Sequence, residues 1–181
     1  LCSLATSGFI NFMKMAIDQA IIAHSAGEIP VGAVLLDPAG QVLAKSGNRT
    51  RELKDPSAHA EVLVIREACQ ALGNERLSGC DLYVTLEPCA MCASLISASR
   101  IRRLYYGASD KKSGGIEHGA CIFSHSQTHH RPEIYPDAFL PLISIDSKNL
   151  SPGPLIKVPL GISGHTSSVR SPSVEFLCIT C

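Results

Sequence analysis

The stretch from Asp81 to Ser97, DLYVTLEPCAMCASLIS, constrains the fold of this chain more than any other. Its first six residues are mostly apolar, with a tyrosine and two β-branched residues, which predicts a buried strand. Pro88 ends the strand and suits the first turn of the helix that follows. Cys89 and Cys92 are then expected three residues apart in that turn, on one face. Because a helix N-terminus lowers the pKa of a thiol, the pair predicts half of a zinc site.

A second motif, histidine-alanine-glutamate, stands upstream at His59. The pattern over residues 60–72 is helical. Asp55 or Ser57 is expected to cap this helix, with Pro56 in its first turn. His59 would therefore lie in the opening turns, where it could meet a metal ion bound by the two cysteines.

Together the two motifs offer one imidazole and two thiolates, from His59, Cys89 and Cys92. A structural zinc ion usually has four protein ligands, so three leave a position for water. Glu61 is two residues from His59 and does not share its helical face, so it is better placed to serve that water than to bind the metal. H-x-E followed by P-C-x-x-C is the known signature of zinc nucleobase deaminases. A lone C-x-x-C is also typical of structural zinc or redox sites, but a redox site would not account for the histidine-alanine-glutamate motif.

Length, charge and hydropathy narrow the number of domains and the classes of binding partner that the chain can have. The 181 residues suffice for one domain with a full core, and the 16 basic and 16 acidic residues give no net charge that would attract polyanions to the whole chain. Residues 100–131 carry six Lys or Arg against two Asp or Glu, which predicts either a solvated basic face or a phosphate-binding rim. A thiolate zinc site fits a reducing cytoplasm. No apolar run approaches the roughly 18 residues of a membrane span, and the first ten residues lack the basic start of a signal peptide.

The order of the predicted elements indicates an α/β fold. Alternating strands and helices favour parallel pairing, and the early hairpin is expected to run antiparallel to the rest. We therefore expect a mixed sheet of about five strands sandwiched by helices, with the site beyond the carboxyl ends of the strands. The expected helices cover residues 9–24, 60–72 and 90–97, and the expected strands cover 31–36, 41–46, 81–86 and 102–107, with a polar loop at 47–50.

The composition changes after Tyr135. Residues 136–181 hold six of the eleven prolines and eight serines, and they show no sustained helical period. An extended or disordered tail is expected there. Cys178 and Cys181 form a second C-x-x-C without histidine or cysteine partners nearby in sequence, so it is not a predicted metal site.

Several longer segments carry a family resemblance. GEIPVGAVLL, SGNRTRELKDPSAHAEVLVIREAC, LGNERLSGCDLYVTLEPCAMCASLIS, RIRRLYYGASD, GGIEH and HHRPEIY resemble the bacterial tRNA-specific adenosine deaminase family, within the cytidine deaminase-like superfamily. The resemblance implies a zinc-dependent deaminase domain over residues 1–135, clearest over 27–135, followed by an atypical tail over 136–181. It also implies hydrolytic deamination of the wobble adenosine in a tRNA anticodon to inosine, by a cytoplasmic homodimer with one zinc ion per subunit.

The resemblance also assigns roles to single residues. His59, Cys89 and Cys92 would hold zinc, Glu61 would carry the proton, and Asp110 would face the backbone of the anticodon loop. Lys111, Lys112 and Arg131 are candidates for contacts with the RNA backbone. The residues expected to line the pocket for the base are Glu28, Ile29, Pro30, Val31, Asn48 and Ala58.

Two rival functions share these motifs. A deaminase of free guanine or cytosine carries the same H-x-E and P-C-x-x-C elements. An inactive, zinc-stabilised RNA-binding subunit is suggested by the tail, since relatives continue with an amphipathic helix that helps to hold RNA. Retention of Glu61 argues against the second rival, because a structural zinc site does not need that carboxylate.

Overall fold

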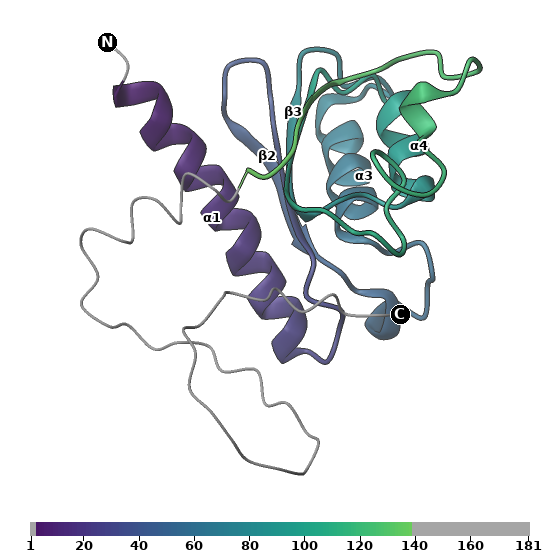
Figure 1. Ribbon diagram of the computed structural model, residues 1–181. Helices are drawn as coiled ribbons and strands as arrows, with labels where there is room; N and C mark the ends of the chain where they lie inside the picture. The colour runs from purple at the N-terminus through teal and green to yellow at the C-terminus, as the bar shows by residue number, and fades with distance from the viewer. Residues whose placement is uncertain (1–2, 139–181) are drawn as a thin grey trace, which may run out of the picture.

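A computed structural model describes residues 3–138 of the chain. One sheet of five strands stands between helices, with α1 on one side and α3 and α4 on the other (Figure 1). The proline- and serine-rich tail, with Cys178 and Cys181, lies outside the described residues. In chain order the elements are α1 (Ser3–Ser25), β1 (Gly32–Leu36), β2 (Val42–Gly47), α2 (Thr50–Leu53), α3 (Ala60–Leu72), β3 (Asp81–Leu86), α4 (Ala90–Ala98), β4 (Arg103–Ala108), the 3-10 helix η1 (Ile122–Ser124) and β5 (Glu133–Tyr135).

The strand order in the sheet is β2-β1-β3-β4-β5. Strand β1 runs antiparallel to both β2 and β3, whereas β3, β4 and β5 run parallel to one another. This confirms the expected leading hairpin followed by parallel strands. The carboxyl end of β3 leads directly into α4, so the sheet delivers the two motif cysteines to one edge.

The sheet buries both of its faces because residues of the central strands alternate between them. In β1, Val34 packs on the side of α1, while Ala33 and Leu35 join the larger cluster formed with α3 and α4. Helix α1 approaches β1 so closely that a Cβ on Gly32 would collide with the carbonyl oxygen of Ala16. The absence of a side chain at Gly32 is therefore what lets the helix lie on the strand.

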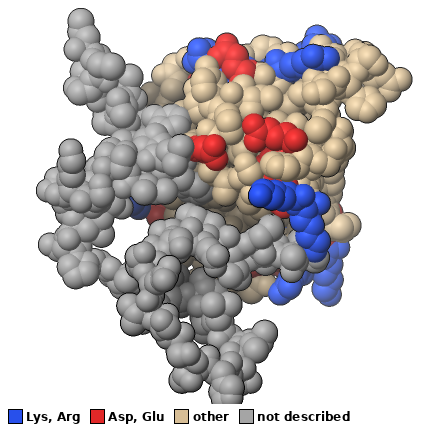
Figure 2. All heavy atoms as spheres, in the orientation of Figure 1, with Lys and Arg blue, Asp and Glu red and all other residues tan. Residues whose placement is uncertain are grey.

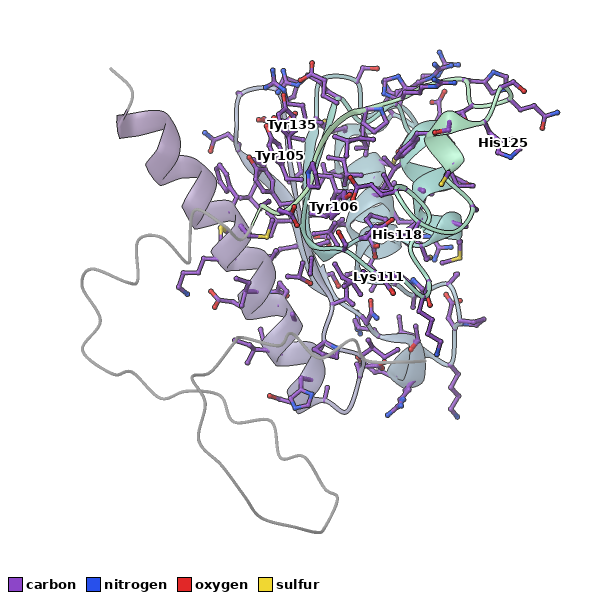
Figure 3. All side chains as sticks on the ribbon, viewed as in Figure 1. Tyr105, Tyr106, Lys111, His118, His125 and Tyr135 are labelled. Carbon is purple, nitrogen blue, oxygen red and sulfur yellow. The ribbon has the colours of Figure 1, made fainter. Side chains whose placement is uncertain are left out.

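A row of aromatic rings crosses the α1 side of the sheet. The rings of Tyr83, Tyr105 and Tyr135 come from adjacent parallel strands and stack with centroid distances of 4.4 and 4.6 Å. Figure 3 shows Tyr105 and Tyr135 next to each other. Phe12 of α1 adds a tilted contact to Tyr83 at 5.6 Å. Ala138 is buried in the same cluster, so the described chain continues to pack beyond the domain end expected at residue 135.

The structure differs from the sequence-based expectations at three elements. Helix α1 begins at Ser3 instead of Phe9, and the polar loop expected at residues 47–50 leads into the short helix α2. Strand β5 was not expected as a strand, although its residues belong to one of the quoted segments. None of the helices in the described part of the chain has the length and apolar character to cross a bilayer.

Candidate metal centre and active site

Two helices begin at the first ligand residue of each motif. His59 is the N-cap of α3 and Cys89 is the N-cap of α4, both with extended backbone angles. Each residue was expected within the first turns of its helix, and it lies just before them. Their carbonyl groups accept the first helical hydrogen bonds, from the amides of Leu63 and Ala93. Neither side chain caps its own helix. Both side chains are therefore available to the space between the two helix starts.

The caps predicted for the first of these helices are wrong. The Asp55 carboxylate accepts hydrogen bonds from the amide and hydroxyl of Ser57, at 2.8 and 2.7 Å, and so closes a turn before the helix. The missing acceptor comes from Asn48, whose Oδ1 takes a 2.8 Å hydrogen bond from the amide of Ala60. Pro56 and Pro88, both expected in the first turn of a helix, precede the N-caps and lie outside the helices.

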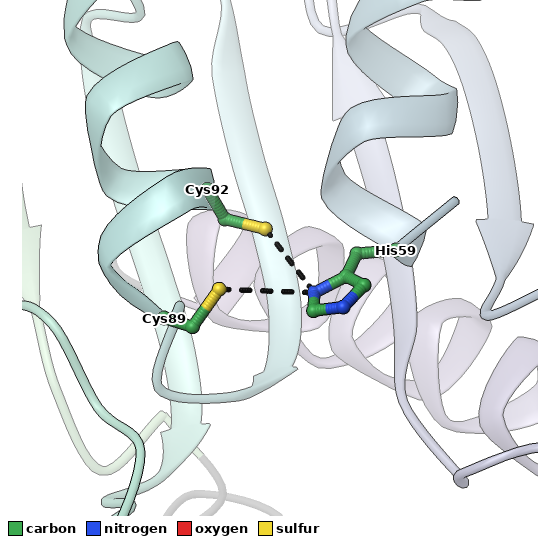
Figure 4. A group of neighbouring side chains, drawn as sticks. All are labelled: His59, Cys89 and Cys92. Carbon is green, nitrogen blue, oxygen red and sulfur yellow. Dashed lines mark hydrogen bonds between the residues drawn. The ribbon is translucent and has the colours of Figure 1, made fainter. Parts of the chain in front are cut away.

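The three predicted ligands meet between the helix starts (Figure 4). His59 Nδ1 lies 3.7 Å from Cys89 Sγ and 3.5 Å from Cys92 Sγ. The ligand atoms of the three residues all lie within 4.8 Å of one another. Zinc bonds of about 2.0 Å to nitrogen and about 2.3 Å to sulfur, at a tetrahedral angle, place those atoms about 3.5 Å apart. The spacing and the donor set therefore fit a tetrahedral zinc ion.

Hydrogen bonding within the cluster distributes its protons unevenly. The bond with Cys92 lowers the pKa of Cys89 to about 4, with a further contribution from His59. The same bond, together with burial, raises the pKa of Cys92. The bond with Cys89 raises the pKa of His59. Ligand thiols must lose their protons to bind a cation, so zinc binding at this cluster would release protons.

Glu61 lies in the first turn of α3 and is 3% exposed. Its Oε2 has no hydrogen-bond partner among the residues that the structure describes. Burial raises the pKa of this carboxyl, and the charge of Cys89 adds to the increase. A buried, unpaired carboxyl oxygen next to a ligand cluster is a group poised to exchange a proton with whatever polar molecule enters.

The predicted pocket residues surround the same helix start from a neighbouring segment. The amide of Asn48 donates to the carbonyl of Val31 at 3.0 Å, and the amide of Arg49 donates to the carbonyl of Ala58 at 3.0 Å. Ala58 is fully buried, and Val31 is 8% exposed. Ile29 is partly buried and packs against the core. The segments around residues 29–31, 48 and 58 are thus brought together.

The Glu28 side chain has a structural role that sequence reasoning missed. Its carboxylate accepts hydrogen bonds from the Thr50 hydroxyl at 3.0 Å and from the amides of Arg51 and Glu52 at 2.8 and 2.9 Å. These groups belong to α2, so Glu28 caps that helix from 22 residues upstream. Burial acts to raise the pKa of Glu28, but the amide of Glu52, the Thr50 hydroxyl and the other bonds outweigh it, so the pKa is lowered.

The basic residues proposed for the RNA backbone divide between two ends of β4. Lys111 and Lys112 are exposed just beyond its carboxyl end, whereas Arg131 precedes β5, whose partner residues begin β4 at Arg103. Six strand residues span about 20 Å. Figure 2 likewise shows basic atoms at separate edges of the visible face and not as one patch. The structure therefore brings Lys111 and Lys112 together but leaves Arg131 apart.

Glu87, between β3 and the motif proline, was not singled out from the sequence. Its side chain is fully buried, and its carboxylate accepts hydrogen bonds from the segment between Asp110 and His118. Burial acts to raise the pKa of Glu87, but hydrogen bonds from the Asp110 amide, the His118 side chain and other amides lower it. The local signal was a charged residue at the end of a buried strand, which alone does not reveal partners over 20 residues away.

Comparisons with known proteins agree with this architecture. Residues 9–108 match the family described as the cytidine and deoxycytidylate deaminase zinc-binding region. The tRNA-specific adenosine deaminase of Agrobacterium fabrum is 60% identical over 126 residues, which cover 69% of this chain and 82% of that protein. The tRNA-specific adenosine deaminase of Aquifex aeolicus is 45% identical over 127 residues, covering 69% and 83%.

Solved structures of deaminases are also similar to this chain. A structure from studies of A-to-I editing by tRNA:A34 deaminases at the wobble position superposes with a TM-score of 0.69 and 57% identity, covering 70% of this chain and 97% of that one. A guanine deaminase from Bacillus subtilis superposes with a TM-score of 0.55 at 27% identity, covering 80% and 98%. The fold and the His-Cys-Cys cluster beside a buried glutamate define a zinc-dependent deaminase of the cytidine deaminase class. Within it, the chain belongs to the tRNA-specific adenosine deaminase family.

Proposed function

We infer that this protein converts the wobble adenosine of a tRNA anticodon to inosine by zinc-dependent hydrolysis. The observation that carries the chemistry is the buried, unpaired Oε2 of Glu61 beside the His59, Cys89 and Cys92 cluster. The substrate follows from the relatives, which are named for tRNA and reach 60% identity, whereas the guanine deaminase is 27% identical.

In this proposal the three clustered residues hold one zinc ion per subunit, which when bound makes hydroxide available from water near neutral pH. Glu61 carries the proton. Its carboxyl would accept one proton from the attacking water and pass it to a ring nitrogen of adenine. It would then take the second proton, from the hydroxyl now bonded to C6, and give it to the amino group, which leaves as ammonia while C6 becomes a carbonyl. Burial supports this role because it raises the pKa of Glu61, which makes the carboxyl a better proton acceptor than an exposed glutamate.

The base is held by groups that the fold fixes in place. Asn48 uses its Oδ1 on the amide of Ala60, so its Nδ2 group is left to donate to the base. Ala58 and the backbone of residues 28–31 form the adjoining wall. The adenine must leave its stack to reach this pocket, and an unpaired anticodon loop permits that at low cost.

The RNA backbone is proposed to contact the loop after β4. Asp110 would face the anticodon loop, with Lys111 and Lys112 on its phosphates. Arg131 lies at the other end of β4, so it would contact a part of the tRNA beyond the anticodon loop. The family resemblance further supports a cytoplasmic homodimer, and sedimentation velocity combined with zinc analysis tests the subunit and zinc numbers.

The domain division is also a proposal. We assign the deaminase to residues 1–135 and expect the tail over 136–181 to be dispensable for zinc binding. Because Ala138 is buried against the α1 side of the sheet, a chain ending at Ala138 is the better truncation than one ending at Tyr135. Zinc content and dimer formation of both truncated chains test the assignment.

The function is tested by incubating the purified, zinc-loaded protein with tRNAs that carry a wobble adenosine and reading inosine in the product. Free guanine and free cytosine are incubated in parallel. Inosine in tRNA, without turnover of the free bases, is the expected result. Turnover of guanine or cytosine but not tRNA would select a free-base deaminase, and tRNA binding without any turnover would select an inactive subunit.

A further inference from the structure

The Glu87 carboxylate collects five hydrogen bonds from a single loop. Its Oε2 accepts from the amide of Asp110 at 2.9 Å and pairs with Nδ1 of His118 at 2.8 Å. Its Oε1 accepts from the amides of Ile116, Glu117 and His118 at 3.1, 2.9 and 3.1 Å. A fully buried carboxylate with both oxygens used in this way fixes both ends of the loop from residue 110 to residue 118, called here the 110–118 loop.

The same loop rests on the start of the helix that carries the two cysteines. Gly114 forms an isolated antiparallel bridge with Cys89, and the amide of Gly115 donates to the carbonyl of Pro88 at 2.9 Å. A Cβ on Gly114 would lie 2.5 Å from Glu87 Oε1, and one on Gly115 would lie 2.5 Å from the amide nitrogen of Ala90. Only glycines let the loop approach the carboxylate and the helix this closely.

The exposed part of the loop is thereby oriented relative to the metal cluster. The Asp110 carboxylate accepts hydrogen bonds from the amides of Lys112 and Ser113, at 2.9 and 3.1 Å, so fixing Asp110 also fixes the turn that presents the lysines. Lys111 is exposed on this turn, whereas the His118 side chain is 32% exposed and pairs with Glu87. Glu87 itself reaches the exposed turn through one hydrogen bond, from the amide of Asp110, and the amide of Gly114 closes the turn by donating to the carbonyl of Asp110 at 3.0 Å.

We propose that Glu87 is a positioning residue for the RNA: its carboxylate holds the 110–118 loop against the start of α4, so that the RNA-contacting turn and the metal cluster form one rigid unit. This inference rests on the proposed function, because it assigns the loop to the same substrate. Glu87 touches neither the base nor the metal ligands' side chains in this role. Its effect should therefore fall on substrate binding and not on the chemical step.

The informative variant is Glu87→Gln. With its oxygen in the place of Oε1, the amide keeps the three bonds to residues 116–118, but its NH2 group then faces the Asp110 amide, a second donor. The Asp110 end of the loop is selectively released. Losing a hydrogen bond to a buried charged group increases local opening about 10- to 100-fold. The matched control is Glu67→Gln, which makes the same chemical change on the exposed side of α3.

Two measurements follow on the full-length, zinc-loaded protein. Hydrogen exchange of the amides at residues 110–113 should accelerate about 10- to 100-fold in Glu87→Gln, with zinc content unchanged. With an anticodon stem-loop RNA bearing the wobble adenosine, KM should rise about 10-fold while kcat stays within about 3-fold. Glu67→Gln should match the wild type in both. His118→Ala, which removes one of the five donors and leaves four backbone amides, should shift KM in the same direction by less, and it replaces Glu87→Gln if that variant does not fold.

Each contrary result has a definite meaning. Unchanged exchange at residues 110–113 would show that Glu87 does not hold the loop, and accelerated exchange with an unchanged KM would show that the held loop does not serve the RNA. A fall in kcat alone would move Glu87 to the chemical step. All three overturn the proposal. If the wild type does not deaminate the RNA, the proposed function fails, and the dissociation constant of the same RNA replaces KM; an equal constant for wild type and variant would then overturn this inference as well.

Discussion

Replacing Glu61 by glutamine separates proton transfer from metal binding. The amide has nearly the shape of the carboxyl but cannot accept and return a proton, so a general acid and base is lost while the ligands His59, Cys89 and Cys92 stay in place. Such groups contribute about 100- to 10,000-fold to a rate, and Glu61 is only 3% exposed. We therefore expect kcat to fall by at least about 100-fold, or roughly 2.7 kcal/mol in the barrier.

The same substitution should lower activity without lowering the stability of the folded protein. Burial raises the pKa of Glu61, which means that the folded state disfavours the ionised carboxyl. A carboxyl of this kind lowers stability as the pH rises through its unfolded pKa, and a neutral amide removes that penalty. In zinc-free protein at neutral pH, Glu61→Gln should thus be at least as stable as the wild type.

The assay is single-turnover formation of inosine in a saturating excess of enzyme over anticodon stem-loop, combined with zinc analysis and thermal unfolding. Glu67→Gln, on the exposed side of the same helix, is the matched control and should behave as the wild type. Normal turnover by Glu61→Gln would refute its role as proton carrier. Loss of zinc from that variant would refute the separation of proton transfer from metal binding.

Three further variants test other parts of the structure. Cys89→Ala should reduce zinc to background and abolish the gain in thermal stability that zinc gives, since metal binding is linked to folding; retained zinc would remove Cys89 from the ligand set. Replacing Lys111 and Lys112 by alanine should weaken the binding of many tRNAs to a similar degree and flatten the slope of log binding constant against log salt concentration by about 1.4. An unchanged slope would mean that the two lysines are only a solvated surface. Glu28→Gln should destabilise the protein at neutral pH. Because folding lowers the pKa of Glu28, that difference should begin to shrink as the pH falls below the ordinary glutamate pKa of about 4.3, and it should vanish below the lowered pKa of the folded state. A difference that does not shrink when urea unfolding is followed through this range would contradict the cap.

The parts of the fold that follow local patterns were predictable. The bounds of α3 and β3 match the expected ones because a helical period ends at Gly73 and an apolar run ends before the motif proline. The ligand set was equally accessible, since the P-C-x-x-C spacing places Cys89 and Cys92 at one helix start whatever surrounds them.

The remainder depends on contacts between distant segments. Helix α2 has four residues, too few for a period, and it is capped by Glu28 from far upstream. His59 precedes its helix instead of lying within it because Asn48, 12 residues before Ala60, supplies the cap. The role of Glu87 requires a loop that begins 23 residues later at Asp110. No local pattern contains these distances, so single-sequence reasoning could not supply them.

The aromatic row gives the molecule an optical signal of its own. The chain has no tryptophan, and its four tyrosines are Tyr83, Tyr105, Tyr106 and Tyr135, all on the three parallel strands. Near-ultraviolet absorption and circular dichroism of the RNA-free protein therefore come chiefly from one region of the sheet, with the stacked rings coupled to one another. A change confined to the helix starts at the metal centre would leave this spectrum as it is, whereas separation of β4 or β5 from the sheet would alter it without any attached dye.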